Sequence, residues 1–151
     1  MDITYWNAHE ETLDKDALRE LQLIRLRQTV GQALKTDFYK RRLNKVGISS
    51  GDDIKTLDDI RRIPFTTKDD LREAYPFAML AIDLHDVIRL HTSSGTTGTP
   101  TVIYHSRSDI DNWTDLMARC IISTGVNRGD VFQNMTTYGL FTGGLGFHYG
   151  A

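Results

Sequence analysis

Apolar residues recur at intervals of three and four positions between Leu13 and Leu34. This spacing predicts one amphipathic helix over that range. Its apolar face would consist of Leu23, Leu26, Val30, Ala33 and Leu34. A second, shorter helix is expected over Phe38–Leu43, with Gly47 placed to end it. The basic residues of this second segment are interpreted as a solvated helix face, namely Lys40, Arg41, Arg42 and Lys45.

Further helix starts are indicated where a hydroxyl residue is followed three positions later by an acidic residue. Thr56, Thr67 and Ser108 each begin such a segment, and Pro64 and Pro76 end the first two. The acidic residues after the two threonines are interpreted as helix caps and not as general acids, namely Asp58, Asp59, Asp69 and Asp70.

The helix expected after Ser108 has an apolar stripe and ends near Gly125. The stripe consists of Ile110, Trp113, Leu116, Met117, Cys120 and Ile121. Cys120 is therefore expected to point inward as a small apolar side chain, and not to act as a nucleophile. At the other end of the chain, residues 5–7 are expected to form an ordered arm that packs on later structure.

Short runs of β-branched and aromatic residues predict strands over 86–91 and 102–105, joined as a hairpin. A turn and a strand are expected over 129–135. Strand, helix and strand across residues 101–135 have the length of a parallel βαβ crossover. The predicted fold class is therefore α/β, with a helical N-terminal lead. We expect two parts, a helical segment at 1–80 and an α/β portion at 81–151.

Composition is that of an ordinary globular protein, with 40% hydrophobic and 25% charged residues. A formal net charge of −2 argues against an electrostatic nucleic-acid binder. No apolar run approaches the length of a membrane span, so no membrane partner is expected. The single cysteine leaves no internal disulfide, and this favours a cytoplasmic location.

The segment between the two hairpin strands is rich in glycine and hydroxyl residues. It reads Ser93-Ser94-Gly95-Thr96-Thr97-Gly98-Thr99-Pro100. Gly95 and Gly98 allow close backbone approach, so successive N–H groups and hydroxyls can surround a polyphosphate. The alternative is a surface hairpin whose Ser and Thr side chains only satisfy turns. The segment is not a Walker-type loop, because no lysine follows Gly98 and a strand follows instead of a helix.

A second candidate site lies beyond the strand expected at 129–135, where open α/β sheets place ligands. Tyr138 and Phe141 offer flat apolar walls, and Gly143 and Gly144 leave space beside them, so an aryl group would fit. The alternative is that both rings are simple core packing.

The five histidines show no metal-ligand spacing, so no metal site is predicted. His91 and His105 lie on the paired strands that flank the loop. They are placed to touch a ligand or each other, and structural partners are the simpler expectation.

Three stretches of the sequence carry a family resemblance. The loop at 93–100 resembles the phosphate-binding loop of the adenylate-forming superfamily of acyl-CoA synthetases, adenylation domains and luciferases. The stretches 63–72 (IPFTTKDDLR), 75–77 (YPF) and 138–150 (YGLFTGGLGFHYG) resemble the phenylacetate–CoA ligase branch. The resemblance runs from about Tyr5 to Ala151. Members of that family are longer, so the chain is expected to be the N-terminal fragment of a larger enzyme.

The resemblance implies an acid–thiol ligase that uses MgATP and coenzyme A. Phenylacetate and ATP would give an acyl-adenylate and pyrophosphate, and coenzyme A would then release phenylacetyl-CoA and AMP. The implied phosphate-binding residues are Ser93, Ser94, Gly95, Thr96, Thr97, Gly98 and Thr99. The implied aryl-acid pocket consists of Thr136, Tyr138, Phe141 and Gly143. No catalytic residue is expected within these 151 residues, and the fragment alone is expected to be inactive.

Two positions depart from the family pattern. Thr99 stands where the family loop usually has Lys, and Thr136-Thr137 stands where Tyr-Gly is usual, which leaves room for a different aryl acid. The alternatives are a non-catalytic anion-binding or oligomerisation module and, more remotely, an amidase-like Ser/Ser/Lys hydrolase. A homodimer is an open expectation for the assembly.

Overall fold

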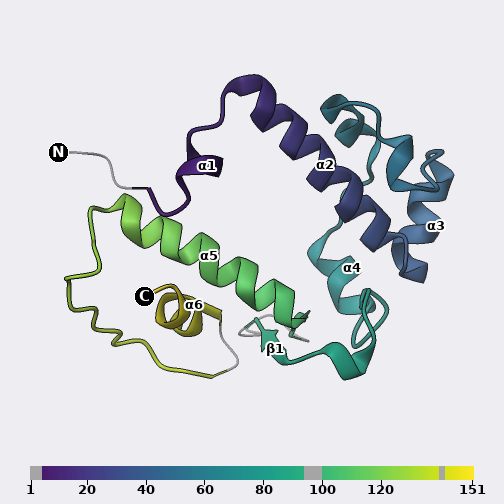
Figure 1. The fold of residues 1–151 in the computed structure, drawn as a ribbon. Coiled ribbons are helices and arrows are strands. Elements are labelled where there is room, and N and C mark those ends of the chain that lie inside the picture. The colour runs from purple at the N-terminus through teal and green to yellow at the C-terminus, as the bar shows by residue number, and fades with distance from the viewer. Residues whose placement is uncertain (1–4, 94–99, 140–141) are drawn as a thin grey trace. The chain divides into compact units, whose positions relative to one another are not determined.

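The computed structural model describes residues 5–93, 100–139 and 142–151 (Figure 1). They pack as two compact units. One unit is Leu13–Leu84, and the other joins the N-terminal residues up to Thr12 with His85–Ala151. A division into a helical part at 1–80 and an α/β part at 81–151 stays a prediction. No described helix is both long enough and apolar enough to cross a membrane.

The first unit is organised around α2 (Lys15–Ala33), which confirms the long helix predicted from periodicity. Asp14 caps its start by accepting hydrogen bonds from the amides of Asp16 and Ala17, at 2.9 and 2.8 Å. The buried core of this unit consists of Val30, Leu43, Ile48 and Ile54. Ile48 and Ile54 are fully buried, and burial of such a side chain contributes about 1.5–3 kcal/mol.

The helix α3 (Asp37–Lys45) confirms the second predicted helix and its glycine end. Gly47 has a φ of +74°, which an L side chain rarely adopts. The chain closes with two bonds to carbonyls of the last turn, from the Gly47 amide to Asn44 and from the Ile48 amide to Leu43, at 3.1 and 3.0 Å. Ile48 and Leu43 also meet in the core, so the helix end and the core stabilise each other.

The capping pattern predicted at the two threonines is present. Thr56 starts the 3₁₀ helix η2 (Leu57–Arg62), and Thr67 starts α4 (Lys68–Glu73), each in a reciprocal box with the acidic residue three positions on. Bonds from the Thr56 backbone, from Arg62 and from the Lys55 backbone lower the pKa of Asp59 to about 2. A third box begins η1 (Gly51–Asp53), which the pattern analysis did not predict.

Arg42 was expected on a solvated helix face, and the structure contradicts this expectation. Its side chain is only 30% exposed. It forms an ion pair with Asp70 at 2.9 Å and donates to the Phe65 carbonyl at 2.6 Å. Its guanidinium also lies over the Phe38 ring, 5.0 Å from the centroid. Arg42 therefore ties α3 to the segment that precedes α4.

The second unit contains the predicted hairpin, formed by β1 (Arg89–Thr92) and β2 (Val102–His105). The strands are antiparallel, with Arg89 opposite His105 and Thr92 opposite Val102. They form a two-stranded sheet. The short 3₁₀ helix η3 (Leu84–Asp86) precedes β1.

The long helix of this unit is α5 (Arg107–Ser123). Its cap is Ser106 and not Ser108, because the Ser106 hydroxyl accepts from the Asp109 amide at 3.2 Å and donates to the Asp109 carboxylate at 2.7 Å. Cys120 is exposed, so the expectation that it points inward was wrong. Leu116, four residues earlier on the same side of the helix, is 52% exposed, because the described elements cover only the neighbouring face.

The N-terminal arm packs on α5, as expected. The Trp6 indole N–H donates to the Asp115 carboxylate at 2.5 Å. The short helix α1 (Ala8–Glu11) follows. Glu10 and Glu11 both pair with Arg119, at 3.1 and 3.5 Å.

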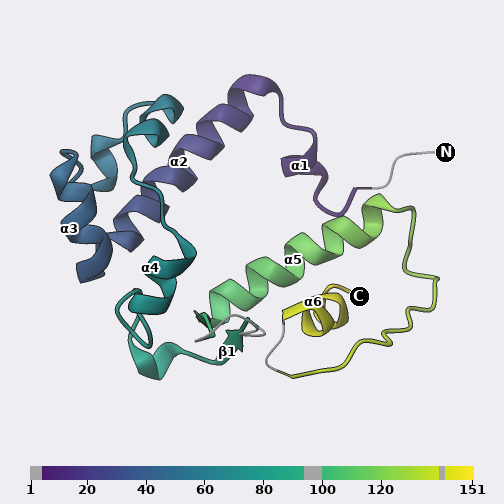
Figure 2. The same ribbon diagram turned by 180° about the vertical axis from the view of Figure 1, so that it is seen from behind.

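The predicted parallel crossover is wrong. Residues 126–139 contain no strand, and a helix that the sequence pattern did not indicate, α6 (Thr142–Gly150), follows. Both views show α6 lying alongside α5 (Figures 1 and 2). The described part of the second unit is therefore a hairpin with two packed helices, accompanied by the short elements α1 and η3, and the whole is helix-dominated.

Glycines explain how α6 approaches α5 so closely. A Cβ on Gly146 would lie 2.5 Å from the Trp113 ring, and one on Gly150 would lie 2.7 Å from the Met117 Cβ. Both pairs are spaced by four residues, so they form matching rows on the two helices. Gly146 and Gly150 permit this packing.

Candidate functional site

The base of the predicted phosphate loop is closed by Ser93 and Thr101. The Ser93 amide donates to the Thr101 carbonyl at 3.1 Å. The Thr101 amide donates in return to the Ser93 hydroxyl, also at 3.1 Å. The other predicted phosphate-binding residues lie outside the described residues, namely Ser94, Gly95, Thr96, Thr97, Gly98 and Thr99.

A histidine pair lies on the hairpin beside the loop base. His91 is 2% exposed, and its ring centroid is 4.7 Å from that of His105 and 5.4 Å from that of Trp113. The His105 ring stacks on Trp113 at 6.2 Å. The two histidines were expected to touch either a ligand or each other, and the structure shows contact with each other.

The pair is held in its neutral form. Burial, together with the charges of His105 and Arg89, lowers the pKa of His91. Burial is also the largest cause of the lowered pKa of His105. Within the described part of the chain, neither ring nitrogen of His91 has a hydrogen-bond partner.

Arg89 connects the hairpin to α6. Arg89 and His91 lie on either side of Leu90 in β1. Because side chains alternate along a strand, Arg89 and His91 share one face of it. Its guanidinium lies 5.2 Å from the centroid of the Tyr149 ring. The strand β1, which leads into the loop, therefore contacts Trp113 of α5 through His91 and Tyr149 of α6 through Arg89.

Three of the four residues predicted for the acid pocket lie near the start of α6. Gly143 is in its first turn. Thr136 donates from its amide and its hydroxyl to the Asn134 side-chain oxygen, at 3.0 and 2.6 Å. The Tyr138 hydroxyl lies 3.0 Å from Nδ1 of His148. Phe141 lies outside the described residues.

Asn134 organises this region, where the sequence predicted only a strand. Its amide nitrogen donates to the Gly144 carbonyl at 2.9 Å and to the Tyr138 hydroxyl at 3.2 Å. One side chain thus links residues 134–138 to α6. Sequence periodicity gives no signal for such a role, because the bonds depend on a helix that was itself not predicted.

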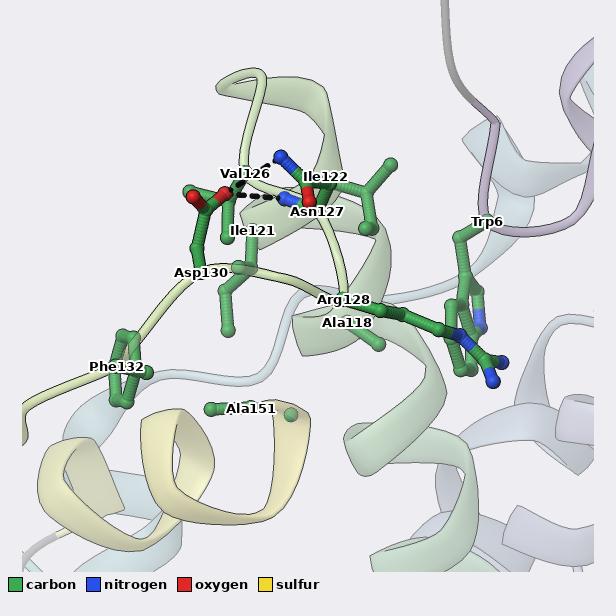
Figure 3. A pocket seen from close by; sticks show the side chains of 11 residues that line it. Trp6, Ala118, Ile121, Ile122, Val126, Asn127, Arg128, Asp130, Phe132 and Ala151 are labelled. Atoms are coloured by element: carbon green, nitrogen blue, oxygen red, sulfur yellow. Dashed lines mark hydrogen bonds between the residues drawn. The ribbon is translucent and has the colours of Figure 1, made fainter.

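A separate pocket of about 250 Å³ opens at the C-terminal end of α5 (Figure 3). Its apolar wall includes Ile121, Ile122 and Phe132, and Trp6 and Arg128 lie at another side. The Arg128 side chain extends toward Trp6 in Figure 3. None of the residues predicted for the acid pocket lines it.

A resident metal centre finds no support in the described residues. They contain no group of three or more His, Cys, Asp or Glu side chains able to hold an ion.

Sequence comparison shows which known proteins the chain is similar to. No family model matches the sequence. Over 142 residues the chain is 46% identical to the phenylacetate-coenzyme A ligase of Pseudomonas putida and 44% identical to that of Escherichia coli (strain K12). This chain is homologous to phenylacetate-coenzyme A ligases. Each match covers 93% of the chain and 32% of the relative, so the chain spans about a third of the length of these phenylacetate-coenzyme A ligases.

Solved structures agree with this relationship. The chain resembles a 2-hydroxyisobutyryl-CoA ligase in complex with 2-HIB-AMP, with a TM-score of 0.84 and 27% identity. It also resembles that ligase in complex with 2-HIB-AMP and CoA, with a TM-score of 0.85 and 29% identity. The matches cover 97% of this chain and 31% and 32% of those chains. The fold is therefore that of the N-terminal part of an adenylate-forming CoA ligase.

Proposed function

We propose that the chain is the N-terminal part of an ATP-dependent aryl acid–CoA ligase. The overall reaction would convert phenylacetate, ATP and CoA into phenylacetyl-CoA, AMP and pyrophosphate through an acyl-adenylate. The observation that carries the proposal is the homology to phenylacetate-coenzyme A ligases over 93% of the chain, together with the paired strands that present the glycine-rich loop. A non-catalytic anion-binding or oligomerisation module is not favoured by these relatives.

The first step would require the β- and γ-phosphates of MgATP to be held while the carboxylate approaches the α-phosphorus. We assign that work to the loop, through the backbone amides of Gly95 and Gly98 and the hydroxyls of Ser93, Ser94, Thr96, Thr97 and Thr99. Donors fixed before the reaction stabilise developing charge without reorganisation. Because Thr99 stands at the position where the family loop usually has Lys, backbone amides and the magnesium of the substrate would compensate more of the phosphate charge.

The carboxylic acid would lie beside Thr136, Tyr138, Phe141 and Gly143. The bonds of Asn134 to Tyr138 and to the Gly144 carbonyl support this assignment, because they fix the tyrosine ring against the start of α6. Thr136 at the pocket wall favours an aryl acid bulkier than phenylacetate as an additional substrate. The remaining two thirds of the relatives' length would supply the other contacts to nucleotide and CoA.

The test is acyl-CoA formation by the complete gene product that contains these residues. We expect AMP and an aryl-CoA to appear only when ATP, CoA and an aryl acid are all present. The 151 residues alone are expected to give no turnover and serve as the negative control. A complete protein that forms no CoA thioester from phenylacetate or larger aryl acids would contradict the proposal. A cytoplasmic location and a homodimer belong to the same proposal, and fractionation and sedimentation would check them.

A further inference from the structure

The side-chain amide of Asn134 uses all of its hydrogen-bonding capacity. Its oxygen accepts from the amide and the hydroxyl of Thr136, at 3.0 and 2.6 Å. Its nitrogen donates to the Gly144 carbonyl at 2.9 Å and to the Tyr138 hydroxyl at 3.2 Å. Because a backbone amide only donates and a carbonyl only accepts, Thr136 and Gly144 fix which end of the Asn134 side chain is nitrogen.

This orientation decides where the phenol proton of Tyr138 goes. The Asn134 nitrogen is a donor, so the Tyr138 oxygen accepts on that side. The single proton of the phenol is therefore directed to Nδ1 of His148, 3.0 Å away. A neutral imidazole that accepts at Nδ1 carries its own proton on Nε2. The network thus sets the tautomer of His148.

The Nε2–H group of His148 is left as an available donor. The side chain is exposed, and among the described residues none is hydrogen-bonded to Nε2. Its direction is fixed, because the opposite edge of the ring is held by Tyr138. A donor oriented in advance loses little freedom when it binds an oxygen of a ligand.

His148 lies between the two predicted parts of the ligand site. Its ring centroid is 5.5 Å from that of Tyr138, which is assigned to the acid pocket, and 5.6 Å from that of Tyr149. The Tyr149 ring in turn meets Arg89 of β1, the strand that leads into the predicted phosphate loop. The carboxylate of an acid that attacks the α-phosphorus has to lie between the aryl group and the phosphates. Among the described residues, His148 joins those two sides.

We propose that His148 binds the carboxylate of the acid through its Nε2–H group. Tyr138 and Asn134 are the positioning residues that keep the proton on that nitrogen. The contact with the carboxylate rests on the proposed function, whereas the hydrogen-bond network and the tautomer of His148 do not.

The tautomer is tested by NMR of the complete gene product, with histidine labelled at its ring nitrogens. At about pH 8.5 histidine side chains are neutral. His148 should then be a single Nε2–H tautomer, and its signals are assigned by their loss in His148→Gln. In Tyr138→Phe the phenol proton is missing, so both tautomers should be populated. A mixture in the unchanged protein, or no difference in Tyr138→Phe, overturns the proposed network.

The carboxylate contact is tested by the kinetics of two variants of the complete ligase. His148→Asn keeps an oxygen near the position of Nδ1 and removes the Nε2–H donor. It should raise the KM for the acid about ten- to a hundredfold, the effect of losing a hydrogen bond to a charged group, with the KM for ATP unchanged. His148→Gln places an N–H group near the position of Nε2 and should stay within about threefold of the unchanged protein.

A matched control is His85→Asn, because the His85 side chain is 92% exposed and its described ion pair is with the neighbouring Asp86. It should leave both KM values unchanged. An unchanged KM for the acid in His148→Asn overturns the contact, as does an equal rise for acid and ATP or an equal effect of Asn and Gln. Absence of ligase activity in the unchanged protein would instead refute the proposed function and the carboxylate contact with it, while the NMR experiment still decides the network.

Discussion

Arg42 illustrates what a single side chain contributes that sequence periodicity does not reveal. A run of basic residues on a short helix usually marks a solvated face, and three of its neighbours fit that reading. The guanidinium nonetheless joins Asp70, the Phe65 carbonyl and the Phe38 ring. Which basic residue of a run makes such contacts depends on the path of a loop more than twenty residues away, and no local pattern encodes that path.

Replacing this residue should cost measurable stability. For Arg42→Ala, we expect the free energy of unfolding to fall by about 1–3 kcal/mol, because the Asp70 carboxylate and the Phe65 carbonyl lose a charged donor. Arg42→Lys should recover only part of the loss, since an ammonium cannot form both bonds with a planar fork. Urea denaturation would measure both variants, with Arg61→Ala as the control, because Arg61 is 83% exposed in its ion pair. Equal stability of Arg42→Ala and Arg61→Ala would contradict this account.

His91 gives the hairpin a dependence on pH. Its pKa in the folded state is lowered from 6.5 by burial and by the charges of His105 and Arg89. The unfolded chain therefore binds a proton more readily than the folded chain. The contribution of His91 to the free energy of unfolding is complete above pH 6.5 and declines as the pH falls below that value. The described groups facing His91 are Arg89 on its own strand, His105 on β2 and the uncharged Trp113 on α5.

The urea midpoint should therefore decrease between about pH 7.5 and about pH 5.5. In His91→Phe the decrease should be smaller, and the residual part should come from His105, whose pKa is also lowered. The carboxylates of the capping boxes, Asp53, Asp59 and Asp70, do not contribute to this decrease. Each has a pKa below its ordinary value of 3.8, so it stays ionised across this pH range. A midpoint in His91→Phe that falls as steeply as in the unchanged protein would exclude His91 as the source.

At the scale of elements, the sequence predicted those parts whose signals are local. The long helix α2, the end of α3 at Gly47 and the boxes at Thr56 and Thr67 depend on residues within a few positions of each other. The hairpin belongs with them, because two strands flank one short loop. The capping residue of α5 was misplaced by two positions, because Ser106 and Ser108 both precede acidic residues.

The failures at this scale concern elements defined by their neighbours. A strand over 129–135 was expected from β-branched and aromatic residues, yet Val131 is 97% exposed and unpaired in a segment without regular structure. The sequence analysis predicted no helix at the position of α6, and its several glycines disfavour a helix by intrinsic propensity. Its glycines are instead explained by Trp113 and Met117 on α5, and these contacts become visible only once both helices are placed.

Two glycine substitutions in helices should act in opposite directions. Gly146→Ala should lower the free energy of unfolding by about 1–3 kcal/mol, because its Cβ would lie 2.5 Å from the Trp113 ring. Gly31→Ala lies in α2, where a Cβ meets nothing within 4 Å, and it should raise stability by about 1 kcal/mol through helix propensity. Thermal or urea unfolding of both variants would compare them directly. A stabilised Gly146→Ala would show that α6 does not pack on α5 as described.

At the scale of the whole molecule, the candidate site was only partly predictable. The loop motif, the hairpin that carries it and the family were all readable from short stretches of sequence. The closure through the Ser93 hydroxyl, the His91–His105–Trp113 contacts and the role of Asn134 were not, because each joins segments that periodicity treats separately. The chain matches about a third of the length of the phenylacetate-coenzyme A ligases, and the proposed chemistry depends on the remainder.

The most direct test of the central claim is acid-dependent exchange of radiolabelled pyrophosphate into ATP by the complete gene product. This exchange isolates the first half-reaction, in which the loop would hold the terminal phosphates before CoA is involved. We predict label in ATP only when phenylacetate or another aryl acid is present. Exchange that does not require an acid, or no exchange with any aryl acid, would contradict the proposal that this hairpin loop serves the formation of an acyl-adenylate.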